Sequence, residues 1–209
     1  MMSSEVLIRL DVSRETMERL ATYVTMLEKW NRRINLIAKG TAPQVWDRHI
    51  ADSAQLLLYA PPLVGHWLDL GSGGGLPGLV VAIMGGDRGQ VKRVTLVESD
   101  ARKSVFLSEV ARALDLDVTV LNQRVETLTN QVADVVSARA LADLESLFSY
   151  AEPHCAAKGV LLFPKGAMHT QEIATAEKSW SFNKHIHQSM TDPNAAVLEI
   201  QQLKRRIES

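Results

Sequence analysis

A cluster of glycines directly after a short apolar segment constrains the fold of this chain more than any other feature. The apolar segment is Trp67–Leu70, and five of the next eight residues, at positions 71, 73, 74, 75 and 78, are glycine. Glycines between a buried strand and a helix allow a sharp turn and let a ligand approach the backbone. The pattern predicts a strand at 67–70, a ligand-binding loop at 71–78 and a helix from Leu79 to Met84.

The rest of the chain repeats this alternation of strand and helix. Further strands are predicted at 94–98, 117–121, 132–138 and 159–163, and helices at 101–114 and 142–150. Such alternation is typical of a parallel sheet with helices on both faces. The end of the chain differs, because 183–189 and 195–203 flank the turn sequence 191–194, which predicts two antiparallel strands. We expect a Rossmann-like α/β fold, with a mostly parallel seven-stranded sheet and an antiparallel edge.

The first 62 residues show helical periodicity and no strand signal. Ser13 is suited to cap an amphipathic helix over 13–31, and a second helix is expected from Pro43 to Leu57. Pro61 and Pro62 end that helix. We expect residues 1–62 to form a helical extension packed on a core of residues 63–209, the two together making one structural domain.

Composition and charge exclude several classes of protein. With Cys155 as the one cysteine, neither an intrachain disulfide nor a cysteine-based zinc site can form, and the thiol is expected to be buried. The apolar runs Val6–Ile8 and Leu79–Met84 are too short for a signal peptide or a membrane span of ~20 residues. We expect a cytoplasmic protein, a monomer, without a metal. The net charge of −1 means that any nucleic acid must bind through a local basic patch.

Two carboxylates help to distinguish between nucleotide cofactors. Residues Gly73–Gly78 formally satisfy G-x-G-x-x-G, so an NAD-dependent oxidoreductase stays open, whereas no P-loop motif is present. We expect the Asp69 carboxylate to face the ligand, where it would repel a pyrophosphate and attract the ammonium and sulfonium groups of S-adenosylmethionine. Glu98, at the end of the second strand, is placed to accept both ribose hydroxyls. S-adenosylmethionine is therefore the favoured cofactor.

Further motifs carry a resemblance to a known family. They are Trp30–Leu36 (WNRRINL), Arg48–Ser53 (RHIADS), the loop sequence LDLGSGGGLPG, Val136–Ala140 (VSARA) and Phe163–Gly166 (FPKG). In this order, over about residues 20 to 170, the chain resembles the bacterial small-subunit rRNA guanine-N7 methyltransferases, also called glucose-inhibited division protein B. It departs from the family at Ile37, where Thr is usual, and at Gln123–Glu126, where Gly-Arg-Ala-Glu is usual.

The resemblance implies a class I methyltransferase fold and methyl transfer from S-adenosylmethionine to N7 of a guanine in 16S rRNA, free or in the small ribosomal subunit. By position it implies cofactor contacts at Gly71 and Leu76, adenine contacts at Val125 and Glu126, and closure of the pocket by Arg139. With the residues argued above, the predicted cofactor-binding set is Asp69, Gly71, Gly73, Gly75, Leu76, Glu98, Val125, Glu126 and Arg139.

The chemistry implied for the site needs positioning rather than a catalytic residue. Guanine N7 has a lone pair and no proton to lose, so no general base is required. The target is expected to be unpaired, because the major groove of A-form RNA is too narrow for access. Predicted RNA contacts are Arg32, Arg33, Arg48, His49, Arg139 and Lys165, of which the last two follow strands on the ligand side of the sheet. A structural role stays open for His49, and Asp52 is expected to pair with Arg48.

Three other functions are compatible with parts of this pattern. A small-molecule methyltransferase would share the glycine loop and the cofactor. An NAD-dependent oxidoreductase would share the glycine loop and Glu98. A non-catalytic RNA-binding or assembly factor would keep the fold and bind rRNA without consuming the cofactor.

Overall fold

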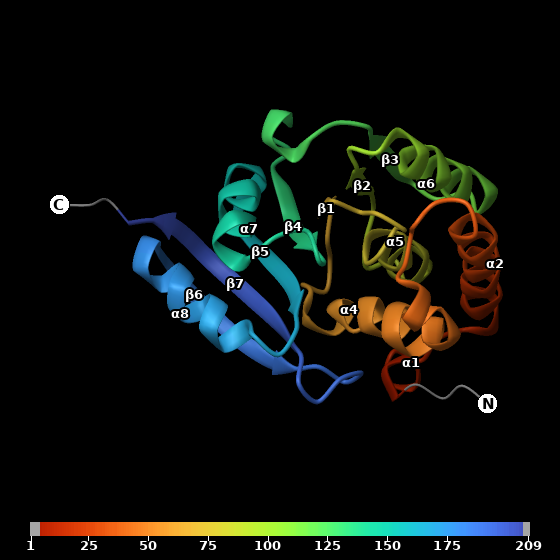
Figure 1. Ribbon diagram of the computed structural model, residues 1–209, viewed down its shortest axis with the longest axis horizontal. Coiled ribbons are helices and arrows are strands. Elements are labelled where there is room, and N and C mark those ends of the chain that lie inside the picture. The colour runs from red at the N-terminus through yellow and green to blue at the C-terminus, as the bar shows by residue number, and fades with distance from the viewer. Residues whose placement is uncertain (1–4, 207–209) are drawn as a thin grey trace.

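A computed structural model describes residues 5–206 and places seven strands in one mixed sheet (Figure 1). The strand order is β3-β2-β1-β4-β5-β7-β6, in which β1 to β5 run parallel and β7 is antiparallel to both of its neighbours. The bounds are β1 Trp67–Leu70, β2 Val94–Val97, β3 Val118–Leu121, β4 Ala133–Ala138, β5 Cys155–Lys165, β6 Trp180–Gln188 and β7 Ala196–Arg205. The predicted fold class and antiparallel edge are confirmed, and β5 extends beyond its predicted bounds at both ends.

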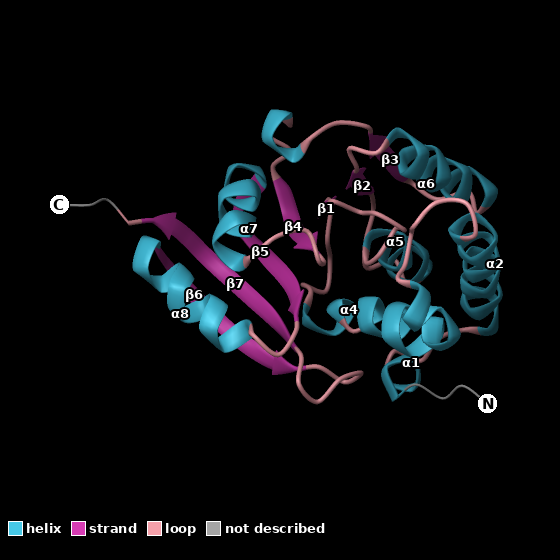
Figure 2. Ribbon diagram, viewed as in Figure 1, coloured by secondary structure: helices cyan, strands magenta, loops and turns pink. Residues whose placement is uncertain are grey.

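Four helices lie where the sequence predicts them (Figure 2). They are α2 Arg14–Asn31, α5 Gly78–Asp87, α6 Ala101–Ala113 and α7 Leu144–Ala151. Ser13 caps α2 as expected, because its side chain accepts a hydrogen bond from the Thr16 amide. Helices α1 (Glu5–Arg9) and α8 (His169–Ser179) were not predicted. In α8 two buried residues, Ile173 and Ala176, face the core, which is too short an apolar stripe to stand out in a polar sequence.

The single helix predicted over 43–57 is wrong. The segment is divided into a 3₁₀ helix at Lys39–Gln44, a π-helical turn at Trp46–Ala51, and the short α-helices α3 (Asp52–Ala54) and α4 (Leu56–Tyr59). Pro43 has no amide hydrogen and lies inside the 3₁₀ helix, which accounts for the irregular start. Two further 3₁₀ turns lie at Val125–Thr127 and Glu152–His154. π-Helical turns are frequent at functional sites, and this one carries Arg48 and His49.

The sheet is covered on both faces, as alternation of its side chains requires. Trp67 and Leu96 face one apolar core with α1, α2, α5 and α6. Leu68 and Val97 face a second core with α7 and α8. The helices before residue 62 share the first core, and Tyr23 from α2 donates a hydrogen bond to the Gly74 carbonyl at 2.6 Å.

The division into a helical extension of 1–62 and a core of 63–209 stays a prediction, and residues 1–4 and 207–209 lie outside the described part of the chain. Within residues 5–206, no helix has the length and apolar character needed to cross a membrane. Cys155 is only partly buried, which corrects the expectation of a buried thiol, and burial raises its pKa to about 11.

Two glycines of α5 provide a test of how closely the loop packs on the sheet. A Cβ at Gly78 would lie 2.2 Å from Leu96 Cδ2 and 2.8 Å from Asp69 Oδ2. We therefore expect Gly78→Ala to lower the free energy of unfolding by about 1–3 kcal/mol, measured by urea denaturation. The matched control is Gly86→Ala, since a Cβ at Gly86 meets nothing within 4 Å. Alanine there should raise stability by about 0.5 kcal/mol through helix propensity, and equal effects of the two variants would contradict the packing argument.

Candidate active site

The glycine loop lies at the carboxyl end of β1, between β1 and α5. Gly71, Gly73 and Gly75 have φ values of +65°, +55° and +85°, which side-chain-bearing residues rarely adopt. A Cβ at Gly71 would lie 2.6 Å from Leu141 Cδ1, and a Cβ at Gly75 would collide with Leu79, whereas a Cβ at Gly73 would meet nothing closer than 3.8 Å. The loop is therefore packed at its two ends, and Gly73 is the glycine at which a ligand can reach the backbone.

Asp69 lies beneath this loop rather than in the open site. Its side chain is completely buried, with Oδ1 accepting from Ser137 Oγ at 2.7 Å and Oδ2 accepting from the Gly78 amide at 3.2 Å. Burial raises the pKa of this carboxyl to about 6, although the hydrogen bonds from Ser137, Ser72 and Gly78 oppose that shift. The expectation that the carboxylate faces the ligand is corrected, because Asp69 fixes the loop to β4 and α5 instead.

Glu98 follows β2 at the edge of the same loop. Its Oε2 accepts from the Gly73 amide at 2.8 Å and its Oε1 accepts from the Asp100 amide at 2.8 Å. A carboxylate has about four acceptor positions, so two remain for other donors, such as the two hydroxyls of a ribose. The chemistry of this group therefore fits the predicted ribose contact.

A cavity of about 140 Å³ opens at the carboxyl end of β2, where Val97 and Ser99, the chain neighbours of Glu98, line it and Glu98 itself does not. It is lined by Gly71, Val97, Ser99, Gln123, Arg124, Val125, Glu126, Leu141 and Tyr150. Its walls combine apolar residues such as Val97 and Leu141 with polar residues such as Ser99, which suits a flat heteroaromatic base. Three of the predicted cofactor residues, Gly71, Val125 and Glu126, lie in this cavity. Leu76 does not, because its side chain is buried in the first core and its amide donates to the Ser72 carbonyl at 3.1 Å.

A second cavity, of about 310 Å³, opens at the carboxyl ends of β4 and β5. Its wall includes the predicted RNA contacts Arg48, His49, Arg139 and Lys165, together with Asp52, Glu172 and the turn between β6 and β7. Arg139, which follows β4, lines this cavity and not the first one. The predicted closure of the cofactor pocket by Arg139 is therefore corrected, whereas its neighbour Leu141 does line the first cavity.

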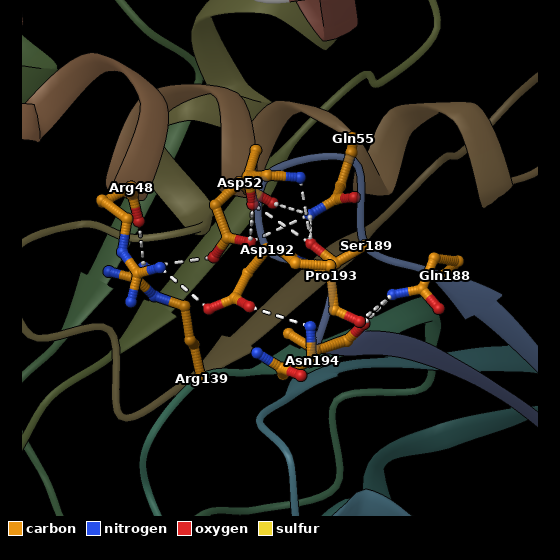
Figure 3. Close-up of polar contacts among 11 residues, drawn as sticks. Arg48, Asp52, Gln55, Arg139, Gln188, Ser189, Asp192, Pro193 and Asn194 are labelled. Atoms are coloured by element: carbon orange, nitrogen blue, oxygen red, sulfur yellow. Dashed lines mark hydrogen bonds and ion pairs between the residues drawn. The ribbon is translucent and has the colours of Figure 1, made fainter.

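Arg139 is held by the irregular helical segment of the N-terminal extension. Its guanidinium donates to the Arg48 carbonyl at 3.3 Å and to Asp52 Oδ2 at 3.4 Å. Figure 3 shows that Asp52, from this segment, and Asp192, from the β6–β7 turn, both point toward the guanidinium groups of Arg48 and Arg139. Arg48 pairs with Asp192 at 2.8 Å, so the predicted pairing of Arg48 with Asp52 is wrong.

His49 is a structural member of this network. Its Nδ1 accepts from Arg139 Nη2 at 3.1 Å, so its Nε2 carries the hydrogen and donates to Thr41 Oγ1 at 2.8 Å. Thr41 in turn donates to the Ala38 carbonyl at 2.9 Å. Burial, Arg139 and Arg48 lower the pKa of His49 to about 4, so the imidazole is neutral at pH 7. The structural alternative for His49 fits these contacts better than direct RNA contact.

Lys165 differs most from its predicted role. Its side chain is 9% exposed, and Nζ donates to the Ala142 carbonyl at 3.0 Å and pairs with Glu172 at 2.6 Å.

Arg32 and Arg33, in contrast to Lys165, are exposed at the end of α2. Asn31 orders the segment after them by accepting from the Leu36 and Ile37 amides.

Comparison with known proteins identifies the family. A model described as rRNA small subunit methyltransferase G matches residues 16–202. A ribosomal RNA small subunit methyltransferase G of Cereibacter sphaeroides is 49% identical over 203 residues, covering 97% of this chain and 98% of the relative. Another, of Paramagnetospirillum magneticum, is 45% identical over 201 residues and covers 96% of each chain. The chain belongs to the rRNA small subunit methyltransferase G family. It is therefore a methyltransferase and not an NAD-dependent oxidoreductase or a non-catalytic factor.

Solved structures of other methyltransferases share the fold. Ribosomal protein L11 methylase of Lactobacillus delbrueckii subsp. bulgaricus aligns with a TM-score of 0.57 at 18% identity, over 77% of this chain and 79% of that one. M. jannaschii TYW2, solved in complex with AdoMet, aligns with a TM-score of 0.57 at 14% identity, over 84% of this chain and 80% of that one. These likenesses confirm the class I methyltransferase fold.

Several residues of this site carried no sequence signal of their own. Leu141 and Tyr150 line the first cavity, and Thr41, Asp192 and Glu172 line the second. Asp192 lies in the predicted turn sequence 191–194, and Thr41 lies outside every motif that the sequence analysis used. Their partners lie far away in the chain, so only the folded structure identifies them as site residues.

The lowered pKa of His49 gives a prediction about acid stability. An unfolded histidine has a pKa near 6.5, so between pH 6.5 and about 4 the unfolded chain binds more protons at this residue than the folded protein. The contribution of His49 to the free energy of unfolding is therefore fully present above pH 6.5 and is lost as the pH falls toward 4. From pH 7 to pH 5, the wild type should lose about 1 kcal/mol more than His49→Asn, which keeps an acceptor for Arg139 and does not titrate.

Urea denaturation at several pH values measures this difference. Asp69 acts in the opposite direction, because its raised pKa favours folding below about 3.8 and that contribution is lost as the pH rises through about 6. Since Asp69 is present in both proteins, its contribution cancels in the comparison. Identical pH profiles for the two proteins would show that His49 is not desolvated in the way described.

Proposed function

We propose that this enzyme methylates N7 of a guanine in the 16S rRNA of the small ribosomal subunit. Its methyl donor is S-adenosylmethionine. The observation that carries the proposal is the pair of cavities at the carboxyl ends of the strands, one lined by Gly71 and Glu126 and one lined by Arg139 and Arg48. Ligands bind at this end of open α/β sheets, so the two cavities suit a cofactor and a target base. What the curated relatives are named for, methylation of small-subunit rRNA, supports the choice of substrate.

We propose cofactor roles for seven of the nine predicted cofactor residues, leaving out Leu76, which is buried in the first core, and Arg139, which lines the second cavity. We assign Glu98 to the ribose hydroxyls, the cavity of Val125 and Glu126 to adenine, and the open backbone at Gly73 to the methionine part of the cofactor. Gly71 and Gly75 provide backbone conformations that other residues adopt at a cost. Asp69 acts indirectly, through the shape of the loop.

The RNA contacts are proposed on charge and exposure. Arg32 and Arg33 are exposed, and the side chain of Arg48 is 43% exposed, so these three can reach phosphates. Arg139 lines the second cavity with a 19% exposed side chain, and we assign it to the target base or the adjacent phosphate. With a net charge of −1, the chain relies on this local set for electrostatic attraction.

The reaction needs little acid–base chemistry from the protein. Bound S-adenosylmethionine supplies a methyl group carried by a positively charged sulfur. The N7 lone pair attacks the carbon of that methyl group in line and displaces the sulfur. N7 releases no proton, so neutral His49 and buried Asp69 need not act as bases. The chain contributes by fixing both reactants, an effect that reaches about 7–11 kcal/mol at best. We further propose that the enzyme acts as a monomer in the cytoplasm, where ribosomes are assembled.

A small-molecule substrate is the competing proposal. It would fit a closed apolar pocket, but the second cavity is lined mainly by charged and polar side chains such as Arg48, Asp52 and Arg139. Family membership also favours rRNA over this alternative.

Glu98 provides a test of the cofactor site. In Glu98→Gln one of the two backbone amides that donate to the carboxylate would face an amide NH₂ group, and the negative charge near the ribose would be lost. We expect binding of S-adenosylhomocysteine, measured by calorimetry, to weaken about ten- to hundredfold. Glu28→Gln, the same change at an exposed position of α2, is the control and should bind as the wild type does. Wild-type affinity in Glu98→Gln would remove Glu98 from the site.

The substrate is tested with ribosomal particles from cells that lack the gene. Purified enzyme is incubated with methyl-labelled S-adenosylmethionine and either small subunits or free 16S rRNA, and the label is mapped. We expect label on N7 of one guanine, and Arg139→Ala should lower the rate at least about tenfold. Arg14→Ala, at a side chain that is 93% exposed on α2, is the matched control. An enzyme that binds cofactor but leaves both RNA samples unlabelled would refute the rRNA proposal.

A further inference from the structure

The loop between β4 and α7, residues 139–143, lies between the two cavities of the site. Arg139 and Ala140 line the second cavity, and Leu141 lines the first. Leu141 also packs directly on Gly71, where a Cβ would lie 2.6 Å from its Cδ1. The conformation of this short loop therefore sets the shape of the cofactor cavity and the direction of Arg139 at the same time.

The backbone of this loop is not in a relaxed conformation. Ala140 has a φ of +53°, which is uncommon for a residue with a side chain. Such conformations persist where surrounding contacts hold the chain on both sides. On the N-terminal side, Arg139 is held by Asp52, His49 and the Arg48 carbonyl.

On the C-terminal side the contacts come from Lys165 and Glu172. Lys165, the last residue of β5, donates from Nζ to the Ala142 carbonyl at 3.0 Å. Glu172, in the first turn of α8, pairs with the same Nζ at 2.6 Å through Oε2. That same oxygen accepts from the amide of Leu144, the first residue of α7, at 2.8 Å. One ion pair thus binds the backbone on both sides of Asp143.

We propose that Lys165 and Glu172 are positioning residues that fix loop 139–143, so that Leu141 covers Gly71 and Arg139 faces the second cavity. The assignment to substrate positioning rests on the function proposed above, whereas the effect on the loop and on cofactor binding does not. Lys165 has a 9% exposed side chain whose charge is balanced by Glu172, so it offers no free charge to an RNA phosphate. This role replaces the RNA contact predicted for Lys165 from the sequence.

Two variants separate the positioning role from a phosphate contact. They are Lys165→Met, which removes the donor, and Glu172→Gln, which keeps the shape of the side chain and removes its charge. If the pair positions the loop, both changes act in the same direction. If Lys165 binds phosphate, Lys165→Met weakens RNA binding, whereas Glu172→Gln removes a negative charge and strengthens it.

The first two quantities, hydrogen exchange of the ligand-free protein and cofactor affinity, are measured without RNA. Amide hydrogen exchange over residues 139–144 should become faster in both variants. Affinity for S-adenosylhomocysteine, measured by calorimetry, should fall about two- to thirtyfold in both. Lys158→Met, the same substitution at an exposed position of β5, is the control and should change neither quantity. Because Glu172→Gln is nearly isosteric, it keeps the test valid if Lys165→Met folds poorly.

The second measurement is the salt dependence of binding to 16S rRNA. The positioning role predicts an unchanged slope of log affinity against log salt in Lys165→Met. Loss of a phosphate contact would reduce that slope by about one. Unchanged exchange and unchanged cofactor affinity in Glu172→Gln, or a reduced slope in Lys165→Met, would overturn the proposal. A failure to methylate rRNA would bear on the proposed function alone, since exchange and cofactor binding do not depend on the RNA.

Discussion

The architecture of the site depends on one buried carboxylate. Trp67 Nε1 donates to Ser137 Oγ at 2.8 Å, and Ser137 Oγ donates to Asp69 Oδ1 at 2.7 Å. The other carboxylate oxygen accepts from the first amide of α5, at Gly78. This chain of contacts joins β1, β4 and α5 at the point where the glycine loop begins. A carboxylate at a helix N-terminus is favoured by the helix dipole, although here burial dominates and raises the pKa to about 6.

Around this centre, segments from the two ends of the chain complete the second cavity. The π-helical turn at Trp46–Ala51 presents Arg48 and His49, and α3 begins with Asp52. Asp52 Oδ1 accepts from Thr191 Oγ1 at 3.0 Å, while its Oδ2 accepts from Arg139. The turn between β6 and β7 therefore contacts the N-terminal segment through the same carboxylate that holds Arg139. The helical extension and the antiparallel edge act as parts of the site rather than as additions to the fold.

Much of the fold was predictable because its signals are local. The strands β1 and β2 are short, mostly apolar and fully buried, and the glycine loop needs the positive φ values that glycine adopts at low cost. The turn sequence at 191–194 correctly predicted an antiparallel pair. In contrast, α8 and the irregular segment from residue 39 to 59 depend on packing, so periodicity alone misjudged them. The position of Glu98 after β2 and next to the glycine loop was predictable, since the chain order defines it, whereas its contact with a ribose stays a proposal.

The sequence by itself determined the class of the protein: an α/β sheet with a glycine loop, an acidic residue after the second strand, and motifs typical of one family. Only the tertiary structure decided which charged side chains are available to a ligand. Asp69, His49 and Lys165 have the residue types of ligand-binding groups, yet the first two are buried, the third is partly buried, and each is bonded to partners distant in sequence. The physical reason is that a charged or polar group removed from water must find partners. Those partners are supplied by other strands and helices, whose positions are set only when the chain folds.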